Sequence, residues 1–357
     1  MNRLTVQTIE LALARLPAAL RPEGGFQAVR RAPVFLAPGL QLYFECRLAG
    51  DDGAIDVSQH FFADDGGAAS LAALADRCGE LAGEAGKTWR RLGHFARLWA
   101  SDGELAAAVR EVGLEHDLGP DGDWVAAPAA FAAFRTDVSG DRAAGRRFVE
   151  TVVPDGLAAW ERALEVVDRA SAHGLVPGRM VGAMLSRDAQ LRVMLRGLSA
   201  PTVERFLDEI GWPGAQPLLL SLLSEPALSG PETRLVLGFA PDLTVDCGLE
   251  VIHERSEAGA VGRKALLEWL VSAGLADRGR VDALDEWTGA LTPANAEAPW
   301  PDALIARDLA SASGELACFN GFLSHVKLNI RTGRLLPAKI YLGLTPLLPR
   351  WEGSAHV

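Results

Sequence analysis

Two lysines near the C-terminal end of the sequence have a spacing that suggests an anion-binding site. The stretches 325–330 and 338–342 alternate apolar and polar residues, which is typical of strands with one apolar face. A turn centred on Gly333 would join them as an antiparallel hairpin and would place Lys327 opposite Lys339. Facing ammonium groups repel by roughly 0.2–1 kcal/mol. We therefore expect a negatively charged group between these two lysines.

Other alternating stretches place further polar residues on the same kind of face. The predicted set is Tyr43, Glu45, Arg47, Glu115, Asp117, Arg192, Arg196, Glu250, His325, Lys327, Lys339 and Tyr341. A cluster of its four cations, Arg192, Arg196, Lys327 and Lys339, would be costly in a low-dielectric cavity without an anion. Arginine binds such an anion with bidentate hydrogen bonds, and lysine acts as a point charge. Glu115 or Glu250 could act as a general base, with Glu45 as a third choice.

Five predicted hairpins would position these residues. Alternation of apolar and polar residues, interrupted by turn residues, predicts hairpins over 40–58, 112–134, 180–196, 234–254 and 325–342. The expected turns include Gly50 to Gly53, Pro120 to Asp123, Ser186 to Asp188 and Pro241-Asp242. Five hairpins supply ten antiparallel strands.

Helices are predicted between the hairpins. The segments 68–109, 143–173, 200–227 and 258–290 carry apolar residues three or four apart, and each has room for two helices. A further amphipathic helix is expected at the start of the chain. The order of one helix, then hairpins separated by helix pairs, indicates a single domain over residues 1–357 built by repetition.

A ten-stranded sheet with one face covered by helices can stay open or close into a barrel. We predict an α+β fold: a closed ten-stranded antiparallel β-barrel built from five ββαα repeats and ringed by helices. The apolar side chains would point outward to the helices, and the polar side chains would point into the lumen. Eight strands leave just enough space for side chains, so ten would leave room for a ligand.

This arrangement resembles the ABBA (α-β-β-α) aromatic prenyltransferases, including the indole-type and cyanobactin peptide enzymes. The resemblance covers most of the chain as an order of elements, and Lys339-Ile340-Tyr341 matches a Lys-x-Tyr pair of that family. It implies a transferase that moves an allylic group from a diphosphate to an aromatic or peptide acceptor in natural-product (RiPP) biosynthesis. Arg192, Arg196, Lys327 and Lys339 would bind the diphosphate, and Tyr43 and Tyr341 would shield the allylic cation. No cofactor is required by this resemblance, although magnesium could accompany the donor.

Several alternatives stay open at this point. Lys327 and Lys339 could lie on a solvent face, as lysines usually do. Arg192 and Arg196 could pair with Glu115 and Glu250 as a buried ion network without chemistry. A relative of the family could also bind a peptide or small metabolite without catalysis, or could catalyse a different transfer or cyclisation. Only two tyrosines occur in the chain, so aromatic shielding is limited.

Composition excludes several other classes. With 357 residues, 49% of them hydrophobic, the chain can bury a large core, and its net charge of −11 argues against nucleic-acid partners. Four scattered cysteines suggest neither disulfides nor a zinc site, and no P-loop, dinucleotide-binding or metalloprotease motif occurs. No apolar run reaches the ~20 residues of a membrane span, and the start of the chain does not read as a signal peptide. We expect a cytoplasmic protein without membrane or metal partners.

Overall fold

The computed structural model describes residues 3–21, 36, 41–50, 55–117, 127–185, 190–228, 232–254, 256–310 and 316–347. The predicted turns at 120–123 and 186–188, and residues 51–53 of the first turn, lie outside these ranges.

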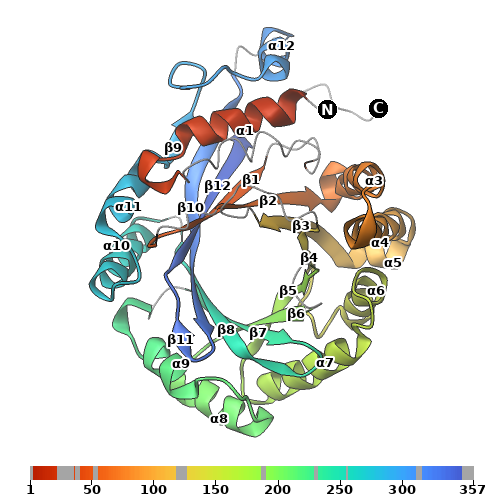
Figure 1. The fold of residues 1–357 in the computed structure, drawn as a ribbon, viewed down its shortest axis with the longest axis vertical. Coiled ribbons are helices and arrows are strands. Elements are labelled where there is room, and N and C mark those ends of the chain that lie inside the picture. The colour runs from red at the N-terminus through yellow and green to blue at the C-terminus, as the bar shows by residue number, and fades with distance from the viewer. Residues whose placement is uncertain are drawn as a thin grey trace.

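The structure is a closed antiparallel barrel of ten strands (Figure 1). Pairing follows chain order from the first strand to the eighth, and the strand Cys318–Arg331 then closes the ring by pairing with both its neighbours. The ten barrel strands are β1 (Leu42–Arg47), β2 (Ile55–Phe62), β3 (Val109–Asp117), β4 (Ala129–Phe134), β5 (Val176–Met184), β6 (Gln190–Arg196), β7 (Glu232–Phe239), β8 (Leu243–Ile252), β10 (Cys318–Arg331) and β12 (Lys339–Leu347). Two short strands, β9 (Gly289–Leu291) and β11 (Arg334–Leu335), pair with β10 outside the ring.

Helices surround the barrel on its outside (Figure 1). They are α1 (Arg3–Arg15), α3 (Gly67–Cys78), α4 (Gly83–Ser101), α5 (Gly103–Ala108), α6 (Arg142–Val152), α7 (Leu157–Ala172), α8 (Ala200–Ile210), α9 (Gln216–Leu223), α10 (Glu257–Ser272), α11 (Arg278–Asp282) and α12 (Asp302–Ala310). Short 3-10 turns are η1 (Ala18–Leu20), η3 (Ala63–Asp65), η4 (Pro226–Leu228) and η5 (Ala283–Glu286). The predicted alternation of hairpins and helical segments is confirmed, and the segments 143–173 and 200–227 hold the expected two helices each. The segment 68–109 holds three helices, α3, α4 and α5, and β9 and α12 lie between α11 and the last hairpin. Within the described ranges, no helix combines the length and the apolar character needed to cross a membrane.

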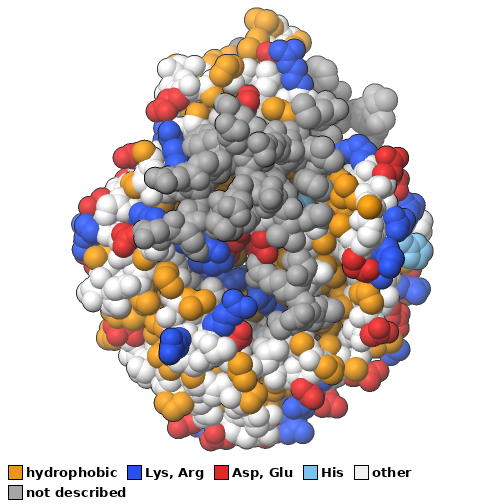
Figure 2. All heavy atoms as spheres, viewed as in Figure 1, with side chains coloured by type: hydrophobic (Ala, Val, Ile, Leu, Met, Phe, Trp, Pro, Cys, Tyr) orange, Lys and Arg blue, Asp and Glu red, His pale blue; other side chains and the backbone are white. Residues whose placement is uncertain are grey.

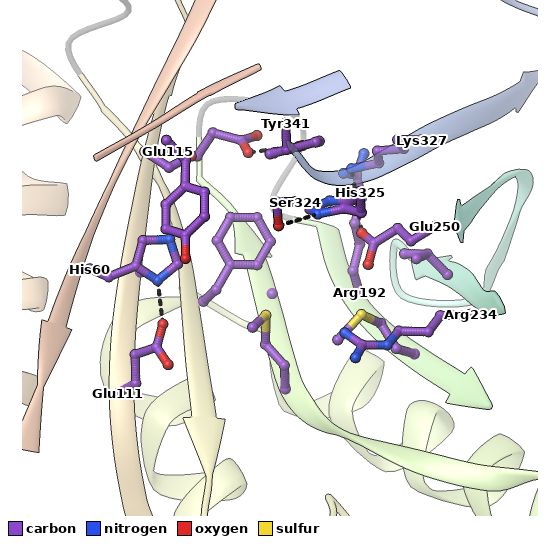
Figure 3. A pocket seen from close by; sticks show the side chains of 18 of the residues that line it. His60, Glu111, Glu115, Arg192, Arg234, Glu250, Ser324, His325, Lys327 and Tyr341 are labelled. Atoms are coloured by element: carbon purple, nitrogen blue, oxygen red, sulfur yellow. Dashed lines mark hydrogen bonds and ion pairs between the residues drawn. The ribbon is translucent and has the colours of Figure 1, made fainter. Parts of the chain in front are cut away.

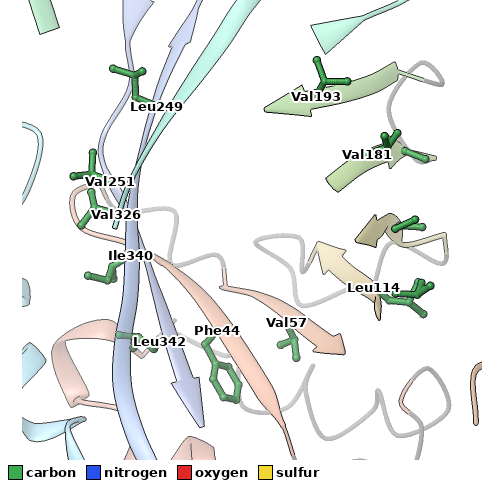
Figure 4. Close-up of a cluster of buried hydrophobic side chains, with 14 of the residues drawn as sticks. Phe44, Val57, Leu114, Val181, Val193, Leu249, Val251, Val326, Ile340 and Leu342 are labelled. Carbon is green, nitrogen blue, oxygen red and sulfur yellow. The ribbon is translucent and has the colours of Figure 1, made fainter. Parts of the chain in front are cut away.

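The main core lies between the barrel and the helices. Outward side chains such as Phe44, Leu114, Val193 and Ile340 are fully buried against this layer (Figure 4). Burying a side chain of this size stabilises the fold by about 1.5–3 kcal/mol. The same alternation turns every second residue into the lumen, so the packing of the outer face fixes which polar groups face inward.

The predicted pairing of the last hairpin is confirmed, but its turn differs. Lys327 lies opposite Lys339, as expected. We expected an odd-numbered turn centred on Gly333. Instead Arg331 pairs with Arg334 across a two-residue turn, in which Thr332 and Gly333 both have positive φ, at 46° and 76°. This geometry suits a tight hairpin. The extra residue that brings Lys339 opposite Lys327 lies between β11 and β12.

Candidate functional site in the barrel lumen

A cavity of about 360 Å³ occupies the lumen, and all ten barrel strands contribute residues to its wall (Figure 3). Six of the eight predicted site residues line it: Tyr43, Glu115, Arg192, Glu250, Lys327 and Tyr341. Arg196 and Lys339 are not among the lining residues. Figure 2 shows basic and acidic side chains close together near the centre of the face that looks down the barrel. The lumen therefore carries both signs of charge.

The two facing lysines each have a carboxylate of the chain itself as partner. Lys339 Nζ donates a hydrogen bond to Glu45 Oε1 and lies 3.6 Å from Asp56 Oδ2. Lys327 Nζ lies 3.9 Å from Glu250 Oε1, on the neighbouring strand β8. The sequence predicted a negative group between the lysines and assigned it to a ligand. Protein carboxylates provide at least part of that charge.

Lys339 belongs to a set of five residues that we call the sealed network: Glu45, Asp56, Glu115, Lys339 and Tyr341. Glu45 accepts hydrogen bonds from Lys339 Nζ and from Tyr341 Oη, and Tyr341 Oη lies 3.2 Å from Glu115 Oε2. Only 2% of the Glu45 side chain and 17% of the Lys339 side chain are exposed. Because these groups bond to one another, the network leaves little charge free for a ligand.

Neighbouring charges shift the pKa values of the three carboxyl groups of the network in different directions. Burial alone would raise the pKa of Glu45, but Lys339 and Lys327 outweigh burial and hold that pKa well below its usual range. Burial and the negative charge of Glu45 raise the pKa values of both Asp56 and Glu115. The Tyr341 hydroxyl has a single proton, which it donates to the Glu45 carboxylate. A protonated Glu115 can then donate to the Tyr341 oxygen, which satisfies all three groups.

A second set, which we call the basic wall, consists of Arg192, Arg234 and Lys327 on β6, β7 and β10. Arg234 Nε lies 3.0 Å from Glu232 Oε1. Arg192 makes no hydrogen bond or ion pair with any described residue, and it lies between Gly182 and Gly238 on the neighbouring strands. Neither neighbour carries a side chain, the Phe131 ring lies over Gly182, and Arg192 lines the cavity.

The cavity wall as a whole is positive, in contrast to the chain. Four basic and three acidic side chains line it, a formal charge of +1 against −11 for the whole protein. A cation such as Arg192, which has no acidic partner among the described residues, favours anionic ligands in such a cavity.

Apolar and aromatic side chains line the rest of the cavity. Phe131, Met180, Met194 and Val236 lie on β4 to β7. Gly182 makes room for Phe131, because a Cβ at this position would lie 2.8 Å from the ring. The cavity therefore combines a charged part with a hydrocarbon-lined part.

The two predicted cation-shielding tyrosines already contact other groups. Tyr341 stacks on His325, with ring centroids 4.0 Å apart, and Lys327 Nζ lies 5.8 Å from the Tyr341 centroid. Tyr43 lies 4.7 Å from the His60 ring and 5.9 Å from the Phe322 ring. Both tyrosines line the cavity, and neither presents an isolated ring.

Arg196 and Glu250 do not form the buried network considered from the sequence. Arg196 Nη1 lies 3.8 Å from Glu232 Oε1, and Glu250 is the partner of Lys327. Within the described residues, no ion pair joins Arg192 or Arg196 to Glu115 or Glu250. The alternative of a structural network between these four residues is wrong.

Sequence reasoning missed His60, Glu111 and Arg234, which all line the cavity. His60 follows Asp56 and Ser58 in the inward alternation of β2, so an extension of the predicted strand by two residues would have found it. Gln59 on the outward face and Phe62 on the inward face obscured that pattern. Glu111 precedes Gly113 and Glu115 on β3 by the same two-residue step.

The described residues hold no group of three or more His, Cys, Asp or Glu side chains arranged to bind a metal. Cys46, Cys78 and Cys247 are buried free thiols. Burial raises the pKa of Cys78 to about 11 and that of Cys247 to about 12, so these thiols stay protonated.

Comparisons with known proteins give a likeness to solved structures and none to known sequences. No protein-family model matches the sequence, and no curated protein does. Among solved structures, the chain is similar to the crystal structure of NotF prenyltransferase, with a TM-score of 0.47 and 10% sequence identity. The match covers 85% of this chain and 79% of that chain. At this level of similarity, the chemistry of the lumen has to be judged from the residues of this chain.

Proposed function

We propose that the protein is a barrel transferase of the ABBA prenyltransferase kind, which moves an allylic group from a diphosphate donor to an aromatic or peptide acceptor. The observation that carries the proposal is Arg192, a cation without a carboxylate partner among the described residues, inside a cavity whose wall is positive. A diphosphate would supply the missing anion and accept bidentate hydrogen bonds from the guanidinium.

The basic wall is the proposed donor site. Arg192 and Lys327 bind the diphosphate as predicted from the sequence, and Arg234 joins them. The hydrocarbon part of the donor would lie against Phe131, Met180 and Met194. As the carbon–oxygen bond breaks, negative charge grows on the diphosphate, and fixed cations stabilise this charge more than that of the intact donor.

The remaining predicted residues take positions around this site. Tyr43 and Tyr341 would shield the allylic cation through their ring faces. Lys339 would act through Glu45 in the sealed network, and Arg196 would have no direct contact with the donor. Of the two predicted bases, Glu250 accompanies Lys327, and Glu115 lies 3.2 Å from Tyr341 Oη in the sealed network.

Calorimetric titration with dimethylallyl thiolodiphosphate, inorganic diphosphate and sulfate tests the donor site. We expect both diphosphates to bind more tightly than sulfate and Arg192→Met to weaken that binding. Arg196→Met is the matched control, because the same residue type lies on the same strand outside the cavity lining. Absence of diphosphate binding at millimolar concentration would overturn the proposal. Mass spectrometry of mixtures with indole compounds and peptides then identifies an acceptor, and chelation with EDTA tests a need for magnesium.

A second candidate function is a non-catalytic barrel that binds a peptide or small zwitterionic metabolite. The separation of charge in the lumen favours it: Glu111 and Glu115 lie on β3, whereas the basic wall lies on β6, β7 and β10. This candidate predicts that a zwitterionic peptide binds and that no allylic product forms with any donor.

A further inference from the structure

A histidine and a carboxylate form a dyad at the side of the cavity opposite the basic wall. His60 Nδ1 is hydrogen-bonded to Glu111 Oε1 (Figure 3). Arg110 Nη2 donates a hydrogen bond to Glu111 Oε2 over 2.9 Å. Both His60 and Glu111 line the cavity. Because Glu111 is held by two partners, it fixes both the orientation and the tautomer of the imidazole.

The second ring nitrogen of His60 is available to a ligand. A carboxylate at Nδ1 requires that nitrogen to carry the proton, which leaves Nε2 with a free lone pair. His60 is 20% exposed, and it makes no other hydrogen bond with a described residue. The groups that surround its ring are Tyr43 on β1, Phe62 on β2, and Glu111 with Arg110 on β3. None of these groups is hydrogen-bonded to Nε2.

The register of the barrel places this dyad level with Arg192. Along one line of paired residues, His60 lies opposite Gly113, Gly113 opposite Phe131, Phe131 opposite Gly182, and Gly182 opposite Arg192. The Phe131 ring lies over Gly182, because a Cβ at this position would lie 2.8 Å from the ring, and the space over Gly113 is next to the His60 ring. Along this line the aromatic ring therefore lies between the histidine and the arginine. A cation site, an aromatic surface and a basic nitrogen thus follow one another across the wall.

We propose that His60 is the catalytic base that accepts the proton of the acceptor, and that Glu111 is its positioning residue. This rests on the proposed function. The carbon–oxygen bond of the donor breaks, and both electrons remain on the diphosphate at the basic wall. An electron pair of the acceptor, an aromatic carbon or an N–H or O–H group, forms the new bond to the allylic carbon. The proton lost from that acceptor atom moves to His60 Nε2, and it passes to water when the product leaves.

Glu111 suits this positioning role. Burial alone would raise the pKa of Glu111, but His60 and Arg110 keep that pKa below its usual value, so the group stays a carboxylate. A carboxylate beside the ring stabilises the imidazolium that forms on proton transfer. Glu115 Oε2, two residues further along the same strand, lies 3.2 Å from Tyr341 Oη and belongs to the sealed network.

Kinetic measurements on the full-length protein test His60. With dimethylallyl diphosphate and an acceptor that the wild type modifies, we expect His60→Ala to lower the transfer rate about 10²–10⁴-fold, the usual contribution of a general base. Calorimetry should show unchanged binding of dimethylallyl thiolodiphosphate. Added imidazole should restore part of the lost rate, because it can occupy the space left by the side chain. The matched control is His94→Gln, which changes an exposed histidine on α4.

Nuclear magnetic resonance of labelled histidine tests Glu111 without any substrate. We expect the His60 ring to carry its proton on Nδ1, and Glu111→Gln to abolish this preference while Glu204→Gln, on the exposed face of α8, leaves it intact. Wild-type transfer rates in His60→Ala, or no rescue by imidazole, would overturn the role of His60. A proton on Nε2 of wild-type His60 would do the same. An inactive wild type that binds no diphosphate would instead overturn the proposed function.

Discussion

The sealed network and the basic wall show that the same residue types can serve different ends within one lumen. Lys339 has a hydrogen-bonded carboxylate and a second carboxylate 3.6 Å away, whereas Arg192 has no acidic partner among the described residues. A buried charge whose partner belongs to the protein contributes to structure. A charge without such a partner depends on water or on a ligand.

The largest expected effect is on stability. Lys339→Met leaves Glu45 and Asp56 buried without their cation, which should lower the free energy of unfolding by about 3–5 kcal/mol. Urea denaturation measures this loss. The double variant Lys339→Met with Glu45→Leu should recover part of it, because the Glu45 charge is removed together with its cation, while Asp56 remains. A single variant as stable as the wild type would show that the network is not structural.

The second effect concerns pH and His325, which packs on Tyr341 in the same region. Burial lowers the pKa of His325 to about 4, so the folded protein favours the neutral imidazole over the protonated one. Stability should therefore be complete above pH ~6.5, the usual value for histidine, and should fall by up to ~1.4 kcal/mol per pH unit down to about pH 4. His325→Gln should reduce this slope in urea titrations between pH 7 and pH 4. His94→Gln should not.

Arg192→Met should weaken ligand binding and leave stability nearly unchanged, whereas Lys339→Met should mainly lower stability. Diphosphate binding should weaken by roughly 1.5–3 kcal/mol, the range for hydrogen bonds to charged groups. Unfolding free energy should change little, because no described carboxylate loses a partner. Calorimetry and urea denaturation on the same sample give both values. A large loss of stability with normal binding would place Arg192 in the structural class.

The smallest effect distinguishes the hydrocarbon-lined part of the cavity from the basic wall. Gly182→Ala places a Cβ 2.8 Å from the Phe131 ring, so the ring has to move and the binding of dimethylallyl thiolodiphosphate should weaken. Inorganic diphosphate should bind as before. Gly113→Ala is the matched control, since its Cβ would lie 3.5 Å from His60, an ordinary contact. Equal losses for both ligands would contradict this arrangement.

Periodicity predicted the fold far better than it predicted the site. The strands and helices each bury one apolar face, and the spacing of apolar residues that produces this face can be read within a single short segment of the sequence. Lys327 opposite Lys339 followed from the same alternation. The inward residues Tyr43, Glu115 and Arg192 were also predictable, because parity alone decides which way a side chain points.

Partnerships across the lumen were not predictable. The bond between Lys339 and Glu45 joins residues 294 positions apart, and nothing in either local pattern selects one partner over another. His60 was missed because the outward polar Gln59 obscured the end of the strand. The tight turn at Gly333 was misjudged, because the odd residue needed for the register can also lie beyond the turn.

Closure of the ring has a consequence for the order in which the protein folds. β1 pairs with β12, and β10 pairs with β8, so residues near position 45 must meet residues near position 341 before a lumen exists. Contacts between such distant parts of a chain form slowly, because a long loop has to close first. Ligand affinity should therefore appear late and all at once during refolding, after most of the helical signal has returned.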